Sequence, residues 1–372
     1  MKIIFAAGGT GGHINPALAT ADEIKRKYPD ASVLFIGTQD HMESRLVPQA
    51  GYELKTIKVE GFKRGKTFKS ALKNVEIGME AVKAQSDAAK IIKEFKPDVV
   101  AGFGGYVSGP VVKAAQQLKI TTAIHEQNAY PGVTNKLLAS NADVVMLAFP
   151  DTEKYLKCKN KPVFTGLPVR RAILEADGEK AKKELSPDNR KIVLSFGGSL
   201  GAEKLNETMT DVISSLYSRP DVRFIHARGG KNESMESQLE KRGIDLKNGT
   251  VDIRQYIFDM DKCLSAADIV VCRSGASTVS EIEAAGKAAI LIPSPNVAEN
   301  HQFKNAMALA EKNAAAVIEE KDLTAQKLSD EIIYLLENDG ARMTMAENAK
   351  NLSRPDALEK IAGIIEDLAM KK

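Results

Sequence analysis

Two similar segments lie about half the chain apart. Residues 2–12 read KIIFAAGGTGG, and residues 191–201 read KIVLSFGGSLG. Each is an apolar run that ends at a Gly-Gly-hydroxyl-x-Gly turn and leads into a helical pattern. A strand that feeds a glycine turn at a helix N-terminus binds phosphate through backbone N–H groups and the helix dipole. Whether it arose by duplication or as two independent turns, this repetition predicts two similar α/β domains that face a shared phosphate-binding cleft.

Length and composition are typical of a globular protein of two domains. The 372 residues fit two domains, and a hydrophobic content of 43% is enough for buried cores. A net charge of +3 gives no reason to expect nucleic-acid binding. The three cysteines, Cys158, Cys263 and Cys272, fit neither a disulfide framework nor a zinc site, which indicates a reducing compartment. No apolar run is long enough to span a bilayer, and the N-terminal run is short for a signal peptide. We therefore expect a cytoplasmic chain whose contact with membranes is peripheral.

Short Val- and Ile-rich runs alternate with helical patterns along the chain. This alternation predicts βαβ units and parallel sheets that are buried on both faces. Periodicity weakens after Phe164, and Gly166-Leu167-Pro168 indicates an interdomain linker. We expect an N-terminal domain over residues 1–163, a C-terminal domain over 164–354, and a last helix at about 355–372 that returns to the first domain. The predicted strands are 2–7, 32–37, 98–103, 121–125, 143–149, 191–196, 222–227, 268–272, 288–293 and 314–319.

The first glycine loop, Gly8–Gly12, is followed at once by His13. Its glycines are not spaced as in the dinucleotide fingerprint G-x-G-x-x-G, and no acidic residue closes the second strand at Gly37-Thr38. A dehydrogenase is therefore disfavoured. Position alone leaves two interpretations of His13 open. The ring either bonds the backbone at the helix start or acts as a general base, because an imidazole with a pKa of about 6.5 accepts a proton at neutral pH.

Two further polar clusters follow strands of the first domain. Residues 102–110 read GFGGYVSGP after one strand, and His125-Glu126-Gln127-Asn128 follows the next. Both are expected at the carboxyl edge of the sheet, where α/β proteins bind ligands. A zinc-protease helix is excluded, because position 129 is alanine instead of histidine and the segment follows a strand.

The second domain carries three candidate ligand-binding segments. Its glycine loop, Gly197–Ala202, is expected to hold a diphosphate. Thr278 and Glu281 fit the capping box S/T-x-x-E, so Glu281 either caps a helix or accepts hydrogen bonds from both hydroxyls of a ribose. Residues 299–302, Glu-Asn-His-Gln, open another helix at a strand end, where they either meet a sugar or face solvent.

Taken together and in this order, the segments resemble the MurG family of bacterial N-acetylglucosaminyltransferases. The matching segments are Gly8–His13 with Pro16-Ala17-Leu18, Gly104–Pro110, His125–Asn128, Gly197–Ala202, Arg273–Glu281 and His301-Gln302. The resemblance implies a GT-B fold, in which two Rossmann-like parallel-sheet domains face a deep interdomain cleft. It also implies inverting transfer of N-acetylglucosamine from UDP-N-acetylglucosamine to the 4-hydroxyl of muramic acid in lipid I. The product would be lipid II for peptidoglycan synthesis, which ties the chain to cell wall biogenesis, cell shape and cell division.

The resemblance also assigns roles to single residues. His13 would be the catalytic base. Arg170 and Ser199 would face the donor diphosphate, Ile257 would offer its backbone to uracil, and Glu281 would hold the ribose. The full set expected around UDP-N-acetylglucosamine is Thr10, Gly11, Gly12, Asn128, Arg170, Ser199, Ile257, Thr278, Glu281, His301 and Gln302. The residues expected on the acceptor side are Gly104, Gly105, Tyr106 and Ser108.

The resemblance implies no metal and no other cofactor. Helix N-termini, backbone N–H groups and Arg170 would stabilise the leaving UDP in place of a metal. Asp259-Met260-Asp261 has the Asp-x-Asp spacing of a metal site but lies in the expected uracil-contact segment. One position departs from the family pattern, because Leu167 stands where the family usually has asparagine. Any polar contact of that asparagine must be absent or replaced.

Two alternative functions stay open at this point. One is another GT-B enzyme, such as a glycolipid synthase or a UDP-sugar epimerase. The other is a non-catalytic nucleotide-sugar sensor that uses the same cleft. For the leading interpretation the expected partners are UDP-N-acetylglucosamine, lipid I, an anionic membrane surface and other proteins of cell-wall synthesis, but no nucleic acid.

The lipid tail of the acceptor requires the first domain to reach the cytoplasmic face of a membrane, and residues 61–79 are the candidate segment. Phe68, Leu72, Val75 and Met79 fall on one helical face at i, i+4, i+7 and i+11. A basic amphipathic segment binds an anionic membrane with about 1 kcal/mol per basic residue near the surface. The alternative is a core-packing stripe with a solvated basic rim. The basic residues around its start are Lys63, Arg64, Lys66, Lys69 and Lys73.

Charge reversal tests this membrane segment. Replacing Lys66, Lys69 and Lys73 together with glutamate is expected to abolish sedimentation of the protein with anionic liposomes, because attraction to the surface becomes repulsion. Unchanged sedimentation would contradict the assignment and favour the core-packing alternative.

Overall fold

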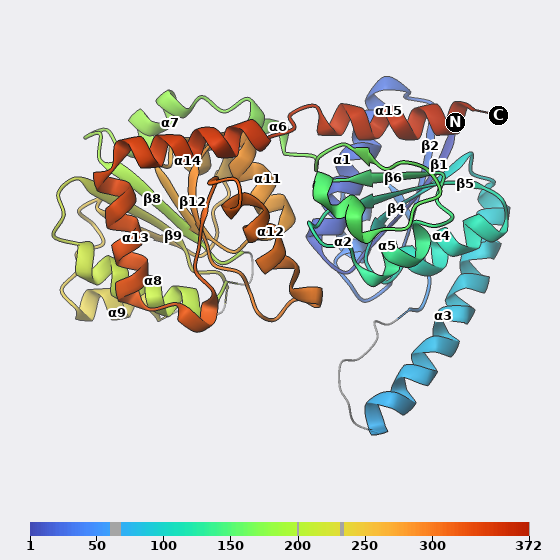
Figure 1. Cartoon of the computed structure of the whole chain (residues 1–372), viewed down its shortest axis with the longest axis horizontal. Helices are drawn as coiled ribbons and strands as arrows, with labels where there is room; N and C mark the ends of the chain where they lie inside the picture. The colour runs from blue at the N-terminus through green and yellow to red at the C-terminus, as the bar shows by residue number, and fades with distance from the viewer. Residues whose placement is uncertain (60–67, 199–200, 231–233, 372) are drawn as a thin grey trace. The chain divides into compact units, whose positions relative to one another are not determined.

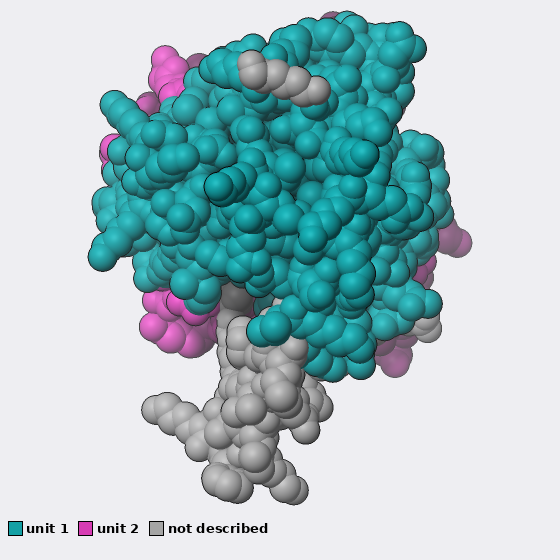
Figure 2. Space-filling view, turned by 90° about the vertical axis from the view of Figure 1, so that its right-hand side faces the viewer, with its two compact units in different colours: residues 1–168, 356–372 teal, residues 169–355 magenta. Residues whose placement is uncertain are grey.

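The chain folds into two compact α/β units. The computed structural model describes residues 1–59, 68–198, 201–230 and 234–371 (Figure 1). Unit 1 comprises Met1–Pro168 and Asp356–Lys372, and unit 2 comprises Val169–Pro355 (Figure 2). The first unit extends past the boundary expected after residue 163, because β7 (Val163–Phe164) pairs with β6 (Val144–Leu147) in its sheet.

Unit 1 is built on a seven-stranded parallel sheet in the order β3-β2-β1-β4-β5-β6-β7. The central strands are almost entirely buried, as expected for a sheet covered on both faces, and β1 and β4 are also mainly apolar. The edge strand β3 has the polar sequence ELKT and is mostly exposed, which explains why hydrophobic runs do not reveal it. The remaining strands are β1 (Lys2–Ala7), β2 (Ser32–Gly37), β3 (Glu53–Thr56), β4 (Val99–Gly104) and β5 (Thr121–Glu126).

Helices cover both faces of this sheet. One face carries α3 (Phe68–Phe95), α4 (Ser108–Gln117) and α5 (Val133–Leu138), whose apolar residues share one core. The other carries α1 (Gly11–Lys27), α2 (Glu43–Gln49) and α15 (Ala357–Met370). The C-terminal helix α15 packs on α1, with Ile361 and Ile365 fully buried in the same core as Phe5 (Figure 1). The short helix η1 (Pro150–Tyr155) leads toward β7.

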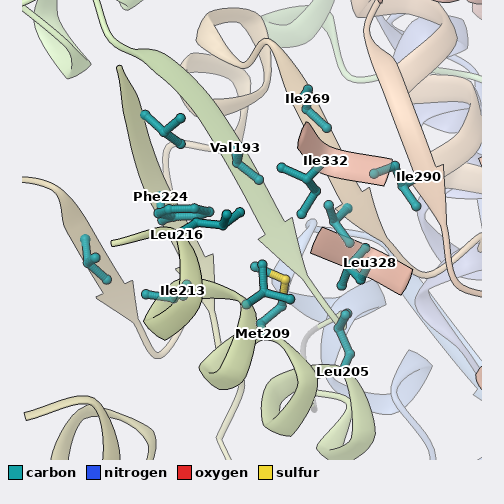
Figure 3. Close-up of a cluster of buried hydrophobic side chains, with 14 of the residues drawn as sticks. Val193, Leu205, Met209, Ile213, Leu216, Phe224, Ile269, Ile290, Leu328 and Ile332 are labelled. Carbon is teal, nitrogen blue, oxygen red and sulfur yellow. The ribbon is translucent and has the colours of Figure 1, made fainter. Parts of the chain in front are cut away.

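Unit 2 repeats this plan with six parallel strands in the order β10-β9-β8-β11-β12-β13. The strands are β8 (Lys191–Phe196), β9 (Val222–Ala227), β10 (Val251–Arg254), β11 (Ile269–Cys272), β12 (Ala288–Leu291) and β13 (Ala316–Val317). A core lies between this sheet and helices α8 (Glu203–Leu216), α9 (Met235–Lys241) and α13 (Ala325–Glu337). It includes Val193, Phe224, Leu328 and Ile332 (Figure 3). The helices are α6 (Arg171–Leu174), α7 (Gly178–Leu185), α8 (Glu203–Leu216), α9 (Met235–Lys241), α10 (Met260–Ala266), α11 (Ala276–Ala285), α12 (His301–Ala310), α13 (Ala325–Glu337) and α14 (Asp339–Leu352), with short turns η2 (Ala298–Asn300) and η3 (Glu320–Asp322).

The strand order places both glycine turns at equivalent points. In each sheet the order reverses beside the first strand, between β1 and β4 in unit 1 and between β8 and β11 in unit 2. Ligands of open α/β sheets bind outside the carboxyl ends of strands at such a switch point. The turns after β1 and β8 lie there. Among the described residues, no helix is both long and apolar enough to pass through a bilayer.

Candidate functional site

The side chain of Glu43 packs tightly against the glycine loop that follows β1. Helix α1 begins at Gly11, with Thr10 as its N-cap residue in extended conformation. Gly9 has φ +85°, which favours glycine. A Cβ at Gly8 would come within 2.5 Å of a carboxylate oxygen of Glu43. The loop therefore requires glycine both for its conformation and for the space that Glu43 occupies.

His13 lies in the first turn of α1 and is held by the loop itself. Its Nδ1 is 3.1 Å from the carbonyl oxygen of Gly8 and 3.3 Å from Oγ1 of Thr10. Because a carbonyl oxygen only accepts, we assign the proton to Nδ1, which leaves Nε2 of the neutral ring as a proton acceptor. Burial lowers the pKa of His13 below its ordinary 6.5, although the Gly8 bond and the charges of Glu126 and Glu43 oppose this. The ring is therefore neutral at pH 7 and suited to act as a base.

Two glycines at the end of β4 allow this arrangement. Gly104 has φ +98°, and a Cβ there would lie 2.7 Å from Cδ2 of His13. A Cβ at Gly105 would lie 2.2 Å from the carbonyl oxygen of Gly8. Tyr106 is 56% exposed beside them. Ser108 is fully buried, and a Cβ at Gly102 would lie 2.5 Å from its Oγ, so its side chain packs closely against β4. Its contact with the acceptor stays a prediction.

The buried carboxylate of Glu126 organises the loop after β5. It accepts hydrogen bonds from the backbone N–H (2.9 Å) and the side-chain amide (3.2 Å) of Asn128. Its other oxygen accepts bonds from the N–H of Gly132 (3.0 Å) and the amide of Asn135 (2.8 Å). Glu126 is thus a structural anchor, and it fixes the position of Asn128 at the carboxyl edge of the sheet.

His125 has a structural role. Its Nε2 is 2.9 Å from the carbonyl oxygen of Gly166, and its ring stacks on Phe103 with centroids 5.5 Å apart. Burial lowers its pKa to about 4. Leu167, the departure from the family pattern, is also buried.

The second glycine turn makes equally close contacts. A Cβ at Gly197 would lie 2.5 Å from the backbone N of Ala202, where α8 is about to begin. Gly201 has φ +80°, and a Cβ there would lie 2.3 Å from the carbonyl oxygen of Arg228. The sequence-predicted diphosphate ligand Ser199 lies outside the described residues.

A buried polar network that sequence reasoning missed supports this second turn. Ser195 Oγ is 2.8 Å from Nδ1 of His226, and Nε2 of His226 is 3.1 Å from Oδ1 of Asn206. The amide of Asn206 donates to the carbonyl oxygen of Arg228 at 2.7 Å. All three side chains are buried, so this Ser-His-Asn series is not a hydrolytic triad but a link between β8, β9 and α8. Two of its members lie on core strands and Asn206 lies on α8, and no local sequence pattern distinguishes them.

A cavity of about 510 Å³ opens beside the second turn in unit 2. Gln302 reaches it from the first turn of α12, and its Oε1 accepts a bond from the N–H of Ser294 at 2.8 Å. Arg273 donates to the carbonyl oxygen of Ile292 at 3.1 Å and forms an ion pair with Glu320. The cavity is lined by Gly197, Gly201, Ala202, Glu203, Lys204, Glu207, Arg273, Ser294, Asn296, Gln302 and Glu320. Of the predicted donor residues, Gln302 lines it and His301 is its neighbour on α12.

Arg170 and Glu281 bind each other, at 2.7 Å between Nε and Oε1. Helix α11 begins at Ala276 with Gly275 as its N-cap, so Thr278 lies inside the helix. The capping-box interpretation of Glu281 is therefore wrong. Arg170 is expected at the donor diphosphate and Glu281 at the ribose, and in this structure the two side chains form an ion pair with each other.

Ile257 lies in the loop between β10 and α10 and is buried. Its neighbours Tyr256 and Phe258 are exposed, with ring centroids 4.9 Å apart. Asp259 accepts a bond from Arg254 at 2.8 Å, which gives it a structural partner. Within the described part of the chain, no three His, Cys, Asp or Glu side chains cluster as a metal site.

The predicted membrane residues are only partly described. Lys63, Arg64 and Lys66 lie outside the described residues. Phe68, Lys69, Leu72, Lys73, Val75 and Met79 lie within α3, where the backbone but not the side chains is described.

Comparison with known proteins decides the family. The glycosyltransferase family 28 N-terminal domain matches residues 3–147, and the C-terminal domain of that family matches residues 192–361. The chain is 46% identical, over 100% of its length and 99% of the relative's, to the UDP-N-acetylglucosamine--N-acetylmuramyl-(pentapeptide) pyrophosphoryl-undecaprenol N-acetylglucosamine transferase of Acetivibrio thermocellus. It is 45% identical, over 99% of its length and 100% of the relative's, to the protein of that name from Thermoanaerobacter sp. (strain X514). The crystal structure of MurG from Acinetobacter baumannii superposes with a TM-score of 0.81 at 32% identity, covering 98% of this chain and 99% of that one.

The chain belongs to the MurG family. The family resemblance and the GT-B fold expected from the sequence are thereby confirmed, since both parallel-sheet units match. More distant structures share the fold alone. The UDP-GlcNAc 2-epimerase of Neisseria meningitidis, for example, has a TM-score of 0.66 at 14% identity, covering 99% of this chain and 100% of that one.

The buried ring of His125 predicts a pH dependence of stability in this MurG-family chain. Burial lowers its pKa in the folded state to about 4, whereas the unfolded chain has the ordinary 6.5. Between these values the unfolded state binds more protons, so the free energy of unfolding is expected to fall as the pH drops from 6.5 toward 4.

The variant His125→Gln keeps an amide donor toward Gly166 but does not titrate. In urea unfolding of unit 1 measured across this pH window, the variant is expected to take up about one proton fewer on unfolding. A variant with the wild-type slope would show that His125 does not carry the effect.

Proposed function

We propose that this chain transfers N-acetylglucosamine from UDP-N-acetylglucosamine to the 4-hydroxyl of the muramic acid of lipid I, which produces lipid II. The names of its full-length relatives at 45–46% identity support this substrate pair. The structural observation that carries the proposal is His13, whose Nδ1 faces the Gly8 carbonyl oxygen at 3.1 Å while Nε2 is left to accept a proton. A neutral imidazole held in one tautomer is what activation of a sugar hydroxyl requires.

The transfer is one in-line displacement with inversion. The 4-hydroxyl oxygen of the acceptor attacks the anomeric carbon of N-acetylglucosamine as the bond from that carbon to the β-phosphate oxygen of UDP breaks. The hydroxyl proton passes to Nε2 of His13, and the bonding electrons leave with UDP. General base catalysis of this kind contributes about 10²–10⁴ in rate.

Unit 2 would hold the donor. The N–H groups of the second glycine turn and the N-terminus of α8 suit a diphosphate. Arg170 would leave Glu281 for the diphosphate, and Glu281 would then accept bonds from the ribose hydroxyls. After this exchange Arg170 pairs with the diphosphate, and the Glu281 carboxylate stays hydrogen-bonded through the ribose hydroxyls, so neither ion is left without a polar partner. Ile257 would contribute backbone to uracil, and Gln302 with His301 would contact the sugar hydroxyls.

Unit 1 would hold the acceptor and the reacting centre. Thr10, Gly11, Gly12 and Asn128 would approach the transferred sugar, with Gly104, Gly105 and Tyr106 on the acceptor side. Because Arg170 and helix N-termini meet the charge that develops on UDP, we propose that no metal cofactor is needed. The undecaprenyl tail places the reaction at the cytoplasmic face of a membrane, with residues 61–79 as the contact. The activity would serve cell-wall biogenesis and, through it, cell shape and division.

A turnover assay tests this function against its alternatives. Purified protein with radiolabelled UDP-N-acetylglucosamine and a lipid I analogue is expected to yield a lipid-linked disaccharide, with and without a chelator. A UDP-sugar epimerase would convert the donor in the absence of acceptor. A nucleotide-sugar sensor would bind the donor without turnover, and either result would contradict the proposal.

Substitution of His13 is expected to lower kcat, whereas substitution of Glu281 is expected to weaken UDP binding. Replacing His13 with alanine should reduce kcat about 10²–10⁴-fold with little change in UDP affinity, because the base acts only in the chemical step. Steady-state kinetics and calorimetry on the same preparation separate the two effects. If kcat stayed within a few-fold of wild type, another group or water would be the base.

Glu281→Ala should weaken UDP binding about 10- to 100-fold, because the ribose hydroxyls lose a charged acceptor. Glu175→Ala is a matched control. Glu175 is the C-cap residue of α6, and its exposed carboxylate pairs with Arg171 of the same helix. It should leave UDP affinity unchanged. Equal affinities for all three proteins in calorimetry would count against the ribose role.

A further inference from the structure

We propose that Glu43 is a positioning residue for His13: its carboxylate fixes the Gly8–Gly9 backbone and thereby orients the imidazole. The inference rests on the proposed role of His13 as base only for its effect on kcat. Its effect on the ring itself is independent of that role.

The carboxylate of Glu43 joins three segments. Glu43 is the first residue of α2 and is fully buried. One oxygen accepts a hydrogen bond from the N–H of Gly9 at 3.0 Å. The other accepts two bonds from Thr38, one from its N–H at 3.0 Å and one from its hydroxyl at 2.6 Å. The loop after β1 is thereby tied to the end of β2 and to the start of α2.

The fit around this side chain leaves the loop little freedom. A Cβ at Gly37 would lie 2.6 Å from Cγ of Glu43, and one at Gly8 would lie 2.5 Å from its Oε1. Gly105 packs against the backbone of Gly8 as well, and a Cβ at Gly105 would lie 2.2 Å from the Gly8 carbonyl oxygen. That same carbonyl oxygen accepts the bond from Nδ1 of His13. The peptide that orients the imidazole is therefore held between Glu43 and Gly105.

Glu43 also contributes charge at this point. Although burial opposes ionisation, hydrogen bonds from Thr38 and Gly9 keep its pKa below the ordinary value, so it remains a carboxylate. The Gly8 carbonyl and the Thr10 hydroxyl contact Nδ1 of His13, and the acidic side chains whose charges act on the ring are Glu43 from α2 and Glu126 from β5. His41 is linked to Glu43 through Thr38, because its Nδ1 is 2.9 Å from the hydroxyl of Thr38 that donates to Glu43. Two carboxylates near the ring favour the imidazolium that forms when His13 takes a proton.

Glu43→Gln tests the proposal. An amide cannot accept from both Gly9 and Thr38, so the loop is released at one of them, and one negative charge near the ring is lost. We expect kcat to fall about 10- to 100-fold through misplacement of the base, with UDP affinity unchanged. The acid limb of the kcat profile should move to lower pH, because the carboxylate that raised the pKa of His13 is gone. A merely structural defect would lower kcat without moving this limb.

Glu23→Gln is the matched control. Glu23 is a buried carboxylate on the same helix as His13, bonded to Arg26 at 2.8 Å. It lies ten residues beyond His13, about 15 Å along the helix axis. This variant should lose stability but keep the wild-type kcat and pH profile. If the control and Glu43→Gln shifted the profile equally, the positioning role would be wrong.

NMR of ¹⁵N-labelled histidine measures the tautomer and the pKa of the His13 ring without any turnover of substrate. The His13 signal is identified by its absence from His13→Asn. In the wild type we expect the Nδ1–H tautomer, and in Glu43→Gln a mixture of tautomers and a lower pKa. An unchanged tautomer and pKa would overturn the proposal. Should His13→Ala retain the wild-type kcat while Glu43→Gln alters the ring, the base assignment fails and the positioning role stands.

Thr38→Val provides a second variant should Glu43→Gln not fold. It keeps the carboxylate but removes the 2.6 Å hydroxyl bond that orients it. We expect a smaller fall in kcat and a smaller change of the His13 signal in the same direction. Wild-type behaviour in both readouts would argue against the proposal.

Discussion

Close approach of backbone to backbone, at the carboxyl ends of parallel strands, is the constraint on which the glycine turns of both units depend. In unit 1 a Cβ at Gly105 would lie 2.2 Å from the Gly8 carbonyl oxygen, and in unit 2 a Cβ at Gly201 would lie 2.3 Å from that of Arg228. Only glycine permits such contacts, and they bring peptide N–H groups and a helix start to the edge of the sheet, an arrangement that suits an anionic ligand. The shared strand order puts both turns at the same topological point of their sheets.

Glycine turns are flexible, so their conformation has to be imposed by neighbouring side chains. Buried polar groups do this in both units. Glu43 and Glu126 brace the loops of unit 1, and the series Ser195, His226 and Asn206 braces the turn of unit 2. A buried polar group is costly unless its hydrogen bonds are satisfied, so each of these favours a single loop conformation. The rigidity of the loops, and with it the orientation of His13, comes from residues that need not touch a ligand.

Sequence patterns predicted most central strands because these strands are buried on both faces and read as apolar runs. They missed the edge strands β3, β7 and β10. The sequences of β3 and β10, ELKT and VDIR, mix polar and apolar residues because an edge is partly exposed, and β7 has only two residues. The capping-box interpretation of Glu281 failed for a related reason. The spacing from Thr278 is correct, but whether a residue caps a helix depends on where the helix begins, and α11 begins before Thr278.

The sequence by itself determined the fold class, the two glycine turns and the family, because hydrophobic period and glycine placement are local properties of the chain. Tertiary structure alone decided which partners the polar side chains take. The proton on Nδ1 of His13, the pairing of Arg170 with Glu281 and the bracing of Gly9 by Glu43 each depend on atoms that lie in other segments of the fold or are set by the loop conformation. Such contacts are fixed by packing at distances of about 3 Å, and no spacing in the sequence encodes them.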